Sequence, residues 1–139
     1  MHRRDFLHLT AAISLAAPLA TLPHAASAAG MAYKPGLIDA ELAAGKVVLV
    51  DYYATWCSTC AAQQRVIAAL RAENPAYDAI RFVEVDWDRW QDDPVTTARN
   101  IPRRSTLILL RGKTELMRIV AGTGKAEIKA MLDAGLAAV

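Results

Sequence analysis

Two cysteines, Cys57 and Cys60, stand three residues apart in the segment Trp56-Cys57-Ser58-Thr59-Cys60, and the chain has no others. The spacing favours redox chemistry over cross-linking. In the loop-entropy account, closing a ring of about 4 residues stabilises a fold by roughly 2 kcal/mol, against about 4.7 kcal/mol for a loop of 100. We therefore predict that Cys57 is an exposed nucleophile and that Cys60 resolves the mixed disulfide formed on it. A pair that ligates a metal, or that is inert, is the alternative.

A single carboxylate, Asp51, interrupts the apolar run from Val47 to Tyr53 just before the cysteines. Such a run is typical of a middle strand that is buried on both faces of a sheet. Ionising a carboxylate there is costly, so we expect the pKa of Asp51 to be raised. The alternative is that the strand ends early and Asp51 faces water.

The first 28 residues have the order of a secretory signal. Arg3 and Arg4 precede an apolar, alanine-rich stretch, and the small residues Ala26-Ser27-Ala28 follow as a cleavage site. The paired arginines followed by x-Phe-Leu are similar to a bacterial twin-arginine signal, with an ordinary Sec signal as the alternative. We expect residues 1–28 to be removed and residues 29–139 to form one domain. We expect no stable membrane insertion after cleavage, because the apolar stretch is shorter than the ~20 residues of a membrane span.

Composition limits which catalytic groups and metal ligands residues 29–139 can provide. All three histidines lie in the signal, at positions 2, 8 and 24, so no imidazole remains for base catalysis or for common zinc and copper sites. The formal charge of the whole chain is +2, and no basic stripe indicates nucleic-acid binding. We therefore expect no metal and no cofactor other than a redox-active disulfide between Cys57 and Cys60.

Periodicity predicts an α/β fold with a mixed central sheet and helices on both faces. The expected helices cover residues 35–44, 57–73, 94–99 and 124–138, and the expected strands cover 46–53, 80–86, 106–110 and 115–121, with a hairpin joining the last two strands. Cys57 would then begin a helix, where unpaired backbone N–H groups and the helix dipole favour a thiolate.

The segment from Val48 to Cys60 resembles the active-site segment of the thioredoxin superfamily: an apolar strand, Asp, two aromatics, Ala, x, Trp and Cys-x-x-Cys. The later stretch from Thr106 to Leu110, followed by Gly112, resembles the third core strand of that family. The resemblance implies that Cys57 attacks, that Asp51 exchanges a proton with Cys60, and that Trp56 covers the disulfide. For Trp56, ordinary packing is the alternative.

Two positions depart from the family pattern. An ungapped count places Glu84 where thioredoxins usually carry a lysine near the buried Asp, and a second carboxylate would raise the pKa of Asp51 further. The family's cis-proline, which faces the cysteines, corresponds either to Pro102 or to Ser105, and we favour Ser105 because the strand register is then kept. Substrate would contact Trp56, Arg104 and Ser105. Arg103 and Arg104 would flank the groove and favour acidic partners, or else be solvated loop charges.

These features together predict an exported, periplasmic thiol-disulfide oxidoreductase that mainly reduces protein disulfides. Its partners would be protein disulfide substrates and a membrane thiol donor of electrons, because an oxidising compartment does not itself supply reductant. Two other functions stay open: a thioredoxin-like protein that binds a soft metal such as copper through its thiolates, and an interaction domain without catalysis.

Overall fold

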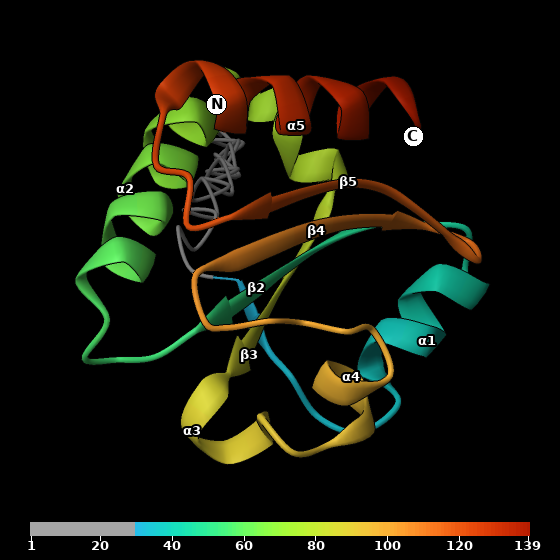
Figure 1. The fold of residues 1–139 in the computed structure, drawn as a ribbon. Coiled ribbons are helices and arrows are strands. Elements are labelled where there is room, and N and C mark those ends of the chain that lie inside the picture. The colour runs from blue at the N-terminus through green and yellow to red at the C-terminus, as the bar shows by residue number, and fades with distance from the viewer. Residues whose placement is uncertain (1–29) are drawn as a thin grey trace, which may run out of the picture.

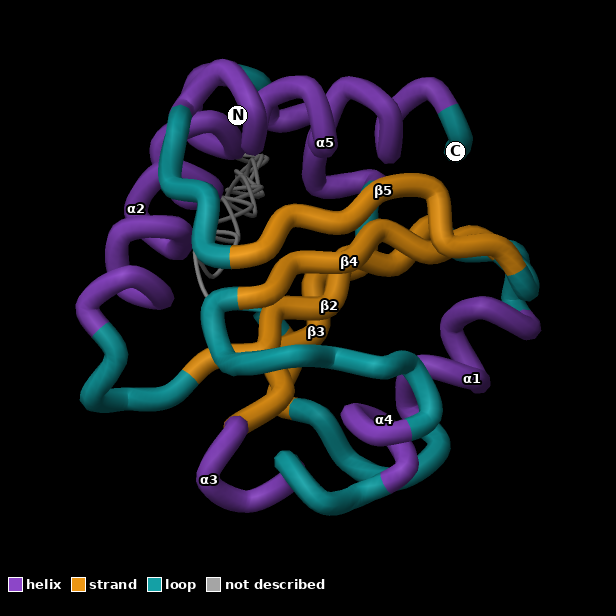
Figure 2. Tube along the Cα trace, viewed as in Figure 1, coloured by secondary structure: helices purple, strands orange, loops and turns teal. Residues whose placement is uncertain are grey.

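The computed structural model describes residues 30–139, and the predicted signal at 1–28 lies outside the described residues. A five-stranded sheet forms the middle layer, in the order β1-β3-β2-β4-β5 (Figures 1 and 2). Strands β1, β3 and β2 run parallel to one another, whereas β4 is antiparallel to both β2 and β5. The strands are β1 (Met31–Ala32), β2 (Val47–Tyr53), β3 (Arg81–Asp86), β4 (Thr106–Arg111) and β5 (Thr114–Val120).

Helices cover both faces of this sheet (Figure 1). On one face lie α2 (Ser58–Glu73) and α5 (Lys125–Ala137), with the short 3₁₀ helix η1 (Pro75–Ala79) beside them. On the other face lie α1 (Leu37–Ala43), α3 (Trp87–Trp90) and α4 (Pro94–Thr97). The predicted fold class, a mixed sheet between two helical layers, is confirmed.

The middle strand β2 divides the core by simple alternation of its side chains. Val47 and Leu49 join the cluster packed under α2 and α5, whereas Val48, Val50 and Tyr52 join the cluster on the α1 side. The same alternation directs Asp51 to the α2 side. The strand therefore carries its carboxylate towards the helix that begins next to the cysteines.

Three short elements were absent from the sequence prediction. They are the two-residue edge strand β1, η1 and α3. None is long enough to show a period in its sequence, and β1 forms because its backbone pairs with β3, as Met31 with Val83. The predicted β4–β5 hairpin is confirmed, with Gly112 in its turn at φ 56°, a conformation that favours glycine.

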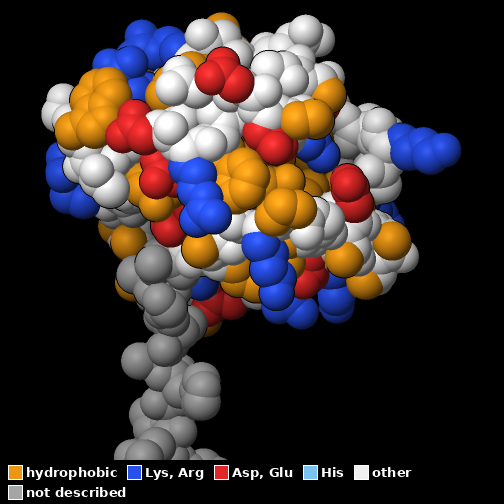
Figure 3. All heavy atoms as spheres, turned by 90° about the horizontal axis from the view of Figure 1, so that it is seen from below, with side chains coloured by type: hydrophobic (Ala, Val, Ile, Leu, Met, Phe, Trp, Pro, Cys, Tyr) orange, Lys and Arg blue, Asp and Glu red, His pale blue; other side chains and the backbone are white. Residues whose placement is uncertain are grey.

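The surface of the α1, α3 and α4 side mixes its charges. In the face shown in Figure 3, basic, acidic and hydrophobic side chains are interspersed rather than gathered by sign. Within residues 30–139, no helix combines the length and apolar character needed to cross a bilayer.

Candidate active site

The two cysteines lie at the start of α2, where the chain leaves β2 and turns back over the sheet (Figure 1). Cys57 is the N-cap residue, in an extended conformation (φ −91°, ψ 110°), and its sulfur accepts a hydrogen bond from the backbone N–H of Cys60 at 3.2 Å. The two side chains form a disulfide, with their Cα atoms 5.3 Å apart. The helix N-terminus thus provides the sulfur of Cys57 with a direct donor as well as a favourable dipole.

The two sulfurs differ in access, although less than the sequence predicts. Cys57 is only 6% exposed, so the prediction that it is an exposed nucleophile is wrong, because Ala54, Tyr53 and Trp87 pack around the pair. Cys60 is completely buried, one turn inside the helix. Of the two cysteines, only Cys57 is in contact with solvent.

Asp51 is buried beneath α2, which confirms its expected placement. It is 4% exposed, its Oδ2 accepts a hydrogen bond from Gln64 Nε2 at 3.0 Å, and its Oδ1 has no hydrogen-bond partner among the described residues. Burial raises the pKa of Asp51 from 3.8 to about 7, the Gln64 hydrogen bond opposes this rise, and the charge of Glu84 adds to it. A carboxyl group with this pKa can take up or release a proton near neutral pH.

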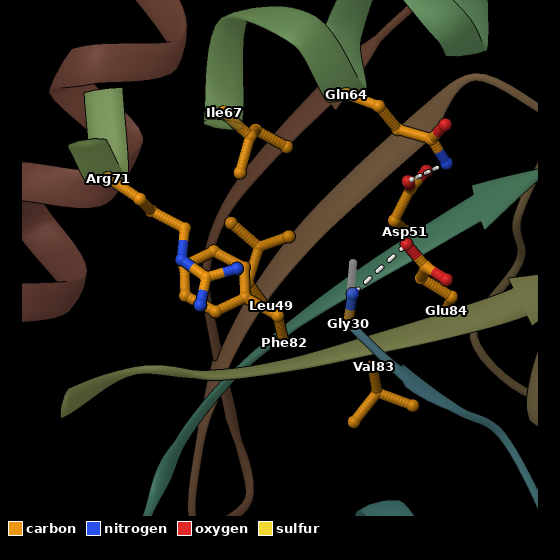
Figure 4. A pocket seen from close by; sticks show the side chains of 9 residues that line it. All are labelled: Gly30, Leu49, Asp51, Gln64, Ile67, Arg71, Phe82, Val83 and Glu84. Carbon is orange, nitrogen blue, oxygen red and sulfur yellow. Dashed lines mark hydrogen bonds between the residues drawn. The ribbon is translucent and has the colours of Figure 1, made fainter. Parts of the chain in front are cut away.

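Glu84 is the direct neighbour of Asp51 in the β2–β3 pairing, as the ungapped count predicts. Both side chains border a small cavity of about 20 Å³, roughly the size of one water molecule (Figure 4). Glu84 Oε1 accepts a hydrogen bond from the backbone N–H of Gly30 at 3.1 Å, so the edge strand β1 begins against this carboxylate.

Ser105 contacts both sulfurs, whereas Pro102 is exposed at the surface. Ser105 immediately precedes β4 and is completely buried, and its Oγ lies 3.2 Å from the Sγ of Cys57 and 3.2 Å from the Sγ of Cys60. The described chain has no cis peptide bond, and Ser105 adopts a left-handed backbone with φ 63°. Such a conformation is unusual for a residue other than glycine and costs about 1–2 kcal/mol.

Gln63 is the site residue that the sequence reasoning missed. It is completely buried on α2, and its Nε2 donates to the carbonyl oxygens of Ser105 at 3.1 Å and of Gly122 at 2.9 Å. It thereby joins α2 to the two loops that flank the disulfide. A signal was available, since Gln63 falls on the same helical face as Cys60, Ile67 and Leu70, where an apolar residue would be expected.

Trp56 lies at the surface beside the pair and is 59% exposed. Its Nε1 donates to Asp88 Oδ2 at 2.8 Å, and the Arg104 guanidinium lies 4.2 Å from its ring centroid. The structure thus brings Trp56 and Arg104 into contact next to the cysteines, with Ser105 buried behind them. The expected role of Trp56 as a cover over the disulfide stays a prediction.

Comparisons with known proteins agree with this geometry. The family model described as Thioredoxin matches residues 34–134. Thioredoxin-1 of Saccharomyces cerevisiae is 31% identical over 96 residues, which cover 69% of this chain and 87% of the relative. Thioredoxin of Mycolicibacterium smegmatis is 35% identical over 89 residues, covering 63% and 76%. The crystal structure of Trxlp from Edwardsiella tarda EIB202 matches with a TM-score of 0.66 and 32% identity, covering 75% of this chain and 98% of that one.

Replacing Asp51 by Asn should stabilise the oxidised protein at neutral and higher pH. In the folded state Asp51 keeps its proton up to about pH 7, whereas in the unfolded state it loses the proton at about pH 4. Between these two pH values the folded state binds more protons than the unfolded state. The free energy of unfolding therefore falls as the pH rises from about 4 to about 7. Removing the charge should raise the free energy of unfolding at about pH 8 by up to about 4 kcal/mol.

Urea unfolding at about pH 4, 6 and 8 measures this difference, which should shrink towards the lowest pH. The control is Asp92→Asn, a change at an exposed carboxylate. Equal stability of the wild type and Asp51→Asn at pH 8 would contradict the assigned pKa.

Replacing Gln63 by Leu should destabilise the protein by about 1–3 kcal/mol, because the Gly122 carbonyl loses its buried donor and the Ser105 carbonyl loses one of two. Chemical unfolding measures the effect. The matched control is Arg65→Leu on the exposed face of the same helix, expected within about 0.5 kcal/mol of the wild type. A Gln63→Leu protein as stable as this control would show that the two hydrogen bonds do not hold the loops to α2.

Proposed function

The chain belongs to the thioredoxin family, and from this premise we propose that it is an exported enzyme that reduces disulfide bonds in other proteins. Family membership together with the Cys57–Cys60 pair makes it a protein-disulfide oxidoreductase. The direction of the reaction, the export and the electron donor are the proposed parts.

One observation carries the proposal: a disulfide at the first turn of α2 lies on the side of β2 that bears a buried, protonatable Asp51. In the reduced state, the helix N-terminus favours the thiolate of Cys57, and this anion attacks a substrate disulfide. Cys60 is shielded from substrate and positioned to displace the captured sulfur. The site therefore contains a nucleophile, a resolving thiol and a base.

Asp51 would serve as the base of the second step. Cys60 must lose its proton before it attacks Cys57, and a carboxylate whose pKa is near 7 is matched to that transfer. Burial is the main reason that the pKa of Asp51 is high, and the charge of the neighbouring Glu84 carboxylate adds to the rise, so uptake of the proton is favoured. Asp51→Asn should accordingly slow the release of reduced substrate more than its capture.

The reductive direction is supported by the resemblance of the Trp56-Cys57-Ser58-Thr59-Cys60 segment, preceded by a buried Asp51, to reductases of the family. Strong oxidants of the periplasm usually carry a histidine between the cysteines, and here Ser58 and Thr59 stand there. We propose that Trp56, Arg104 and Ser105 contact the substrate chain. Trp56 offers an exposed aromatic surface, and Arg104 lies over it as a cation.

Export is supported by the sequence of residues 1–28, with Arg3 and Arg4 ahead of an apolar stretch and a small-residue cleavage site. An exported reductase must receive electrons in the periplasm, and we propose a membrane protein with a thiol pair as the donor.

Copper binding is a separate hypothesis. Within residues 30–139 no group of three or more His, Cys, Asp or Glu side chains is arranged to hold a metal ion, and titration of the reduced protein with Cu(I) would test it.

Equilibration of the protein with glutathione tests whether it reduces or oxidises its substrates. We expect a reduction potential near the roughly −270 mV of thioredoxin, together with reduction of insulin disulfides, and a potential near about −120 mV would instead indicate an oxidant. Cys57→Ser should abolish activity. Cys60→Ala should retain substrate as a mixed disulfide on Cys57, whereas the double variant Cys57→Ser/Cys60→Ala should retain none. An unchanged cellular phenotype in cells that carry Cys57→Ser would support an interaction domain without catalysis.

Fractionation of bacteria that express the full chain tests export. We expect the protein in the periplasm with its N-terminus near Ala29, and we expect Arg3→Lys/Arg4→Lys to retain it in the cytoplasm. Export that survives this double change would indicate a Sec signal. An uncleaved wild-type protein in the cytoplasm would contradict the proposed location.

A further inference from the structure

The backbone of Ser105, which carries the hydroxyl, is held in place by three hydrogen bonds. The backbone N–H of Ser105 donates to the Tyr52 carbonyl at 2.7 Å, and its carbonyl accepts from the Ala121 N–H at 2.8 Å and from the Gln63 amide at 3.1 Å. The residue is completely buried and has φ 63°. A conformation that glycine would adopt more easily is therefore occupied by a residue with a hydroxyl group.

Among the described residues, the two cysteine sulfurs are the hydrogen-bond partners of this hydroxyl. Its Oγ is 3.2 Å from Cys57 Sγ and 3.2 Å from Cys60 Sγ. A disulfide has no proton to give, so in this oxidised state the hydroxyl is the donor and the sulfurs are weak acceptors. A thiolate is a far better acceptor, because hydrogen bonds to an ionised partner are about twice as strong as neutral ones.

We propose that Ser105 is a catalytic residue whose Oγ–H donates a hydrogen bond to whichever cysteine sulfur carries negative charge during exchange. The hydroxyl stabilises the thiolate of Cys57 in the reduced enzyme and stabilises Cys60 when that sulfur becomes anionic. The inference rests on the disulfide exchange of the proposed function, not on its direction or on export.

The hydroxyl keeps its own proton throughout the reaction. The Cys57 thiolate forms a bond to one substrate sulfur, the substrate S–S bond breaks, and the departing thiolate takes a proton from solvent. Cys60 then gives its proton to the Asp51 carboxylate and attacks Cys57 Sγ. The mixed disulfide breaks, and the second substrate thiolate leaves and is protonated. Two electrons pass from the cysteine pair to the substrate, and the Ser105 hydrogen bond moves from one sulfur to the other.

A change at Ser105 leaves the other charged groups near this end of the sheet in place. They include Asp51 on β2, Glu84 and Asp86 on β3, Asp88 on α3, and Arg103 and Arg104 in the loop before β4. The first turn of α2 has no acidic residue. A shift in thiol titration upon substitution can therefore be assigned to the hydroxyl or to the backbone at Ser105.

Two variants separate these causes. Ser105→Ala deletes the hydroxyl and keeps the backbone cost of the left-handed conformation, whereas Ser105→Gly deletes the hydroxyl and relieves that cost. Both should raise the pKa of the reduced Cys57 thiol by about 1. Both should also shift the equilibrium with glutathione about 3- to 10-fold towards the oxidised enzyme, which corresponds to about 15–30 mV for two electrons.

The pH profile of Cys57 alkylation in the reduced protein gives a second signature. Both variants should react about 3-fold more slowly than the wild type at low pH, where fewer thiolates form. They should react about 3-fold faster at high pH, because a less stabilised thiolate is more nucleophilic. A purely structural role of Ser105 would not produce this crossover. Ala121→Gly is the matched control, since it relieves a left-handed residue (φ 60°) beside the site and keeps the hydroxyl.

The proposal is overturned if folded Ser105→Ala and Ser105→Gly proteins retain the thiol pKa, the potential and the alkylation profile of the wild type. It is also overturned if the two variants shift these quantities in opposite directions, or if Ala121→Gly reproduces their effect. Thermal melts verify folding. A wild type that reduces no insulin would instead refute the proposed function, and the thiol titration would still report on Ser105.

Discussion

The position of the first turn of α2 against the sheet is the constraint on which the site depends. Ile67 and Leu70 pack into the same core as Leu49 and Leu107, at roughly 0.8 kcal/mol for each buried methylene. This packing fixes the helix beside β2, so Cys57 is held at a helix N-terminus rather than in a mobile loop. Gln63 then hydrogen-bonds to the loops at Ser105 and Gly122, and the disulfide is surrounded by backbone of fixed geometry.

The carboxyl groups of Asp51 and Glu84 show where function opposes stability. An apolar residue at position 51 would continue the pattern of β2. Asp51 instead places beneath the helix an oxygen that has no hydrogen-bond partner within residues 30–139. Glu84 in the neighbouring strand adds negative charge to the same cavity. The left-handed Ser105 is a third local cost at the same site. The surrounding core sustains all three, and Ser105 places its hydroxyl 3.2 Å from both sulfurs.

The sequence predicts most of this site because its signals are local. Apolar alternation identifies β2, the cysteine spacing identifies the chemistry, and the interruption by Asp51 marks a buried acid. What escaped prediction depends on contacts between distant segments. The backbone conformation of Ser105 follows from hydrogen bonds to Tyr52 and Ala121, and the role of Gln63 follows from loops 42 and 59 residues further along the chain. The strand β1 likewise exists only through its pairing with β3.

Titration of the Cys57 thiolate in the reduced wild-type protein, followed by ultraviolet absorbance with Cys57→Ser as the blank, tests the central claim most directly. A sulfur that caps α2 and accepts hydrogen bonds from the backbone of Cys60 and from Ser105 should ionise well below the pKa of a free cysteine, within the range of about 3.5–7.5 seen at helix N-termini. A thiol that titrates near about 8.5 would contradict it, because the helix start would then provide no activation.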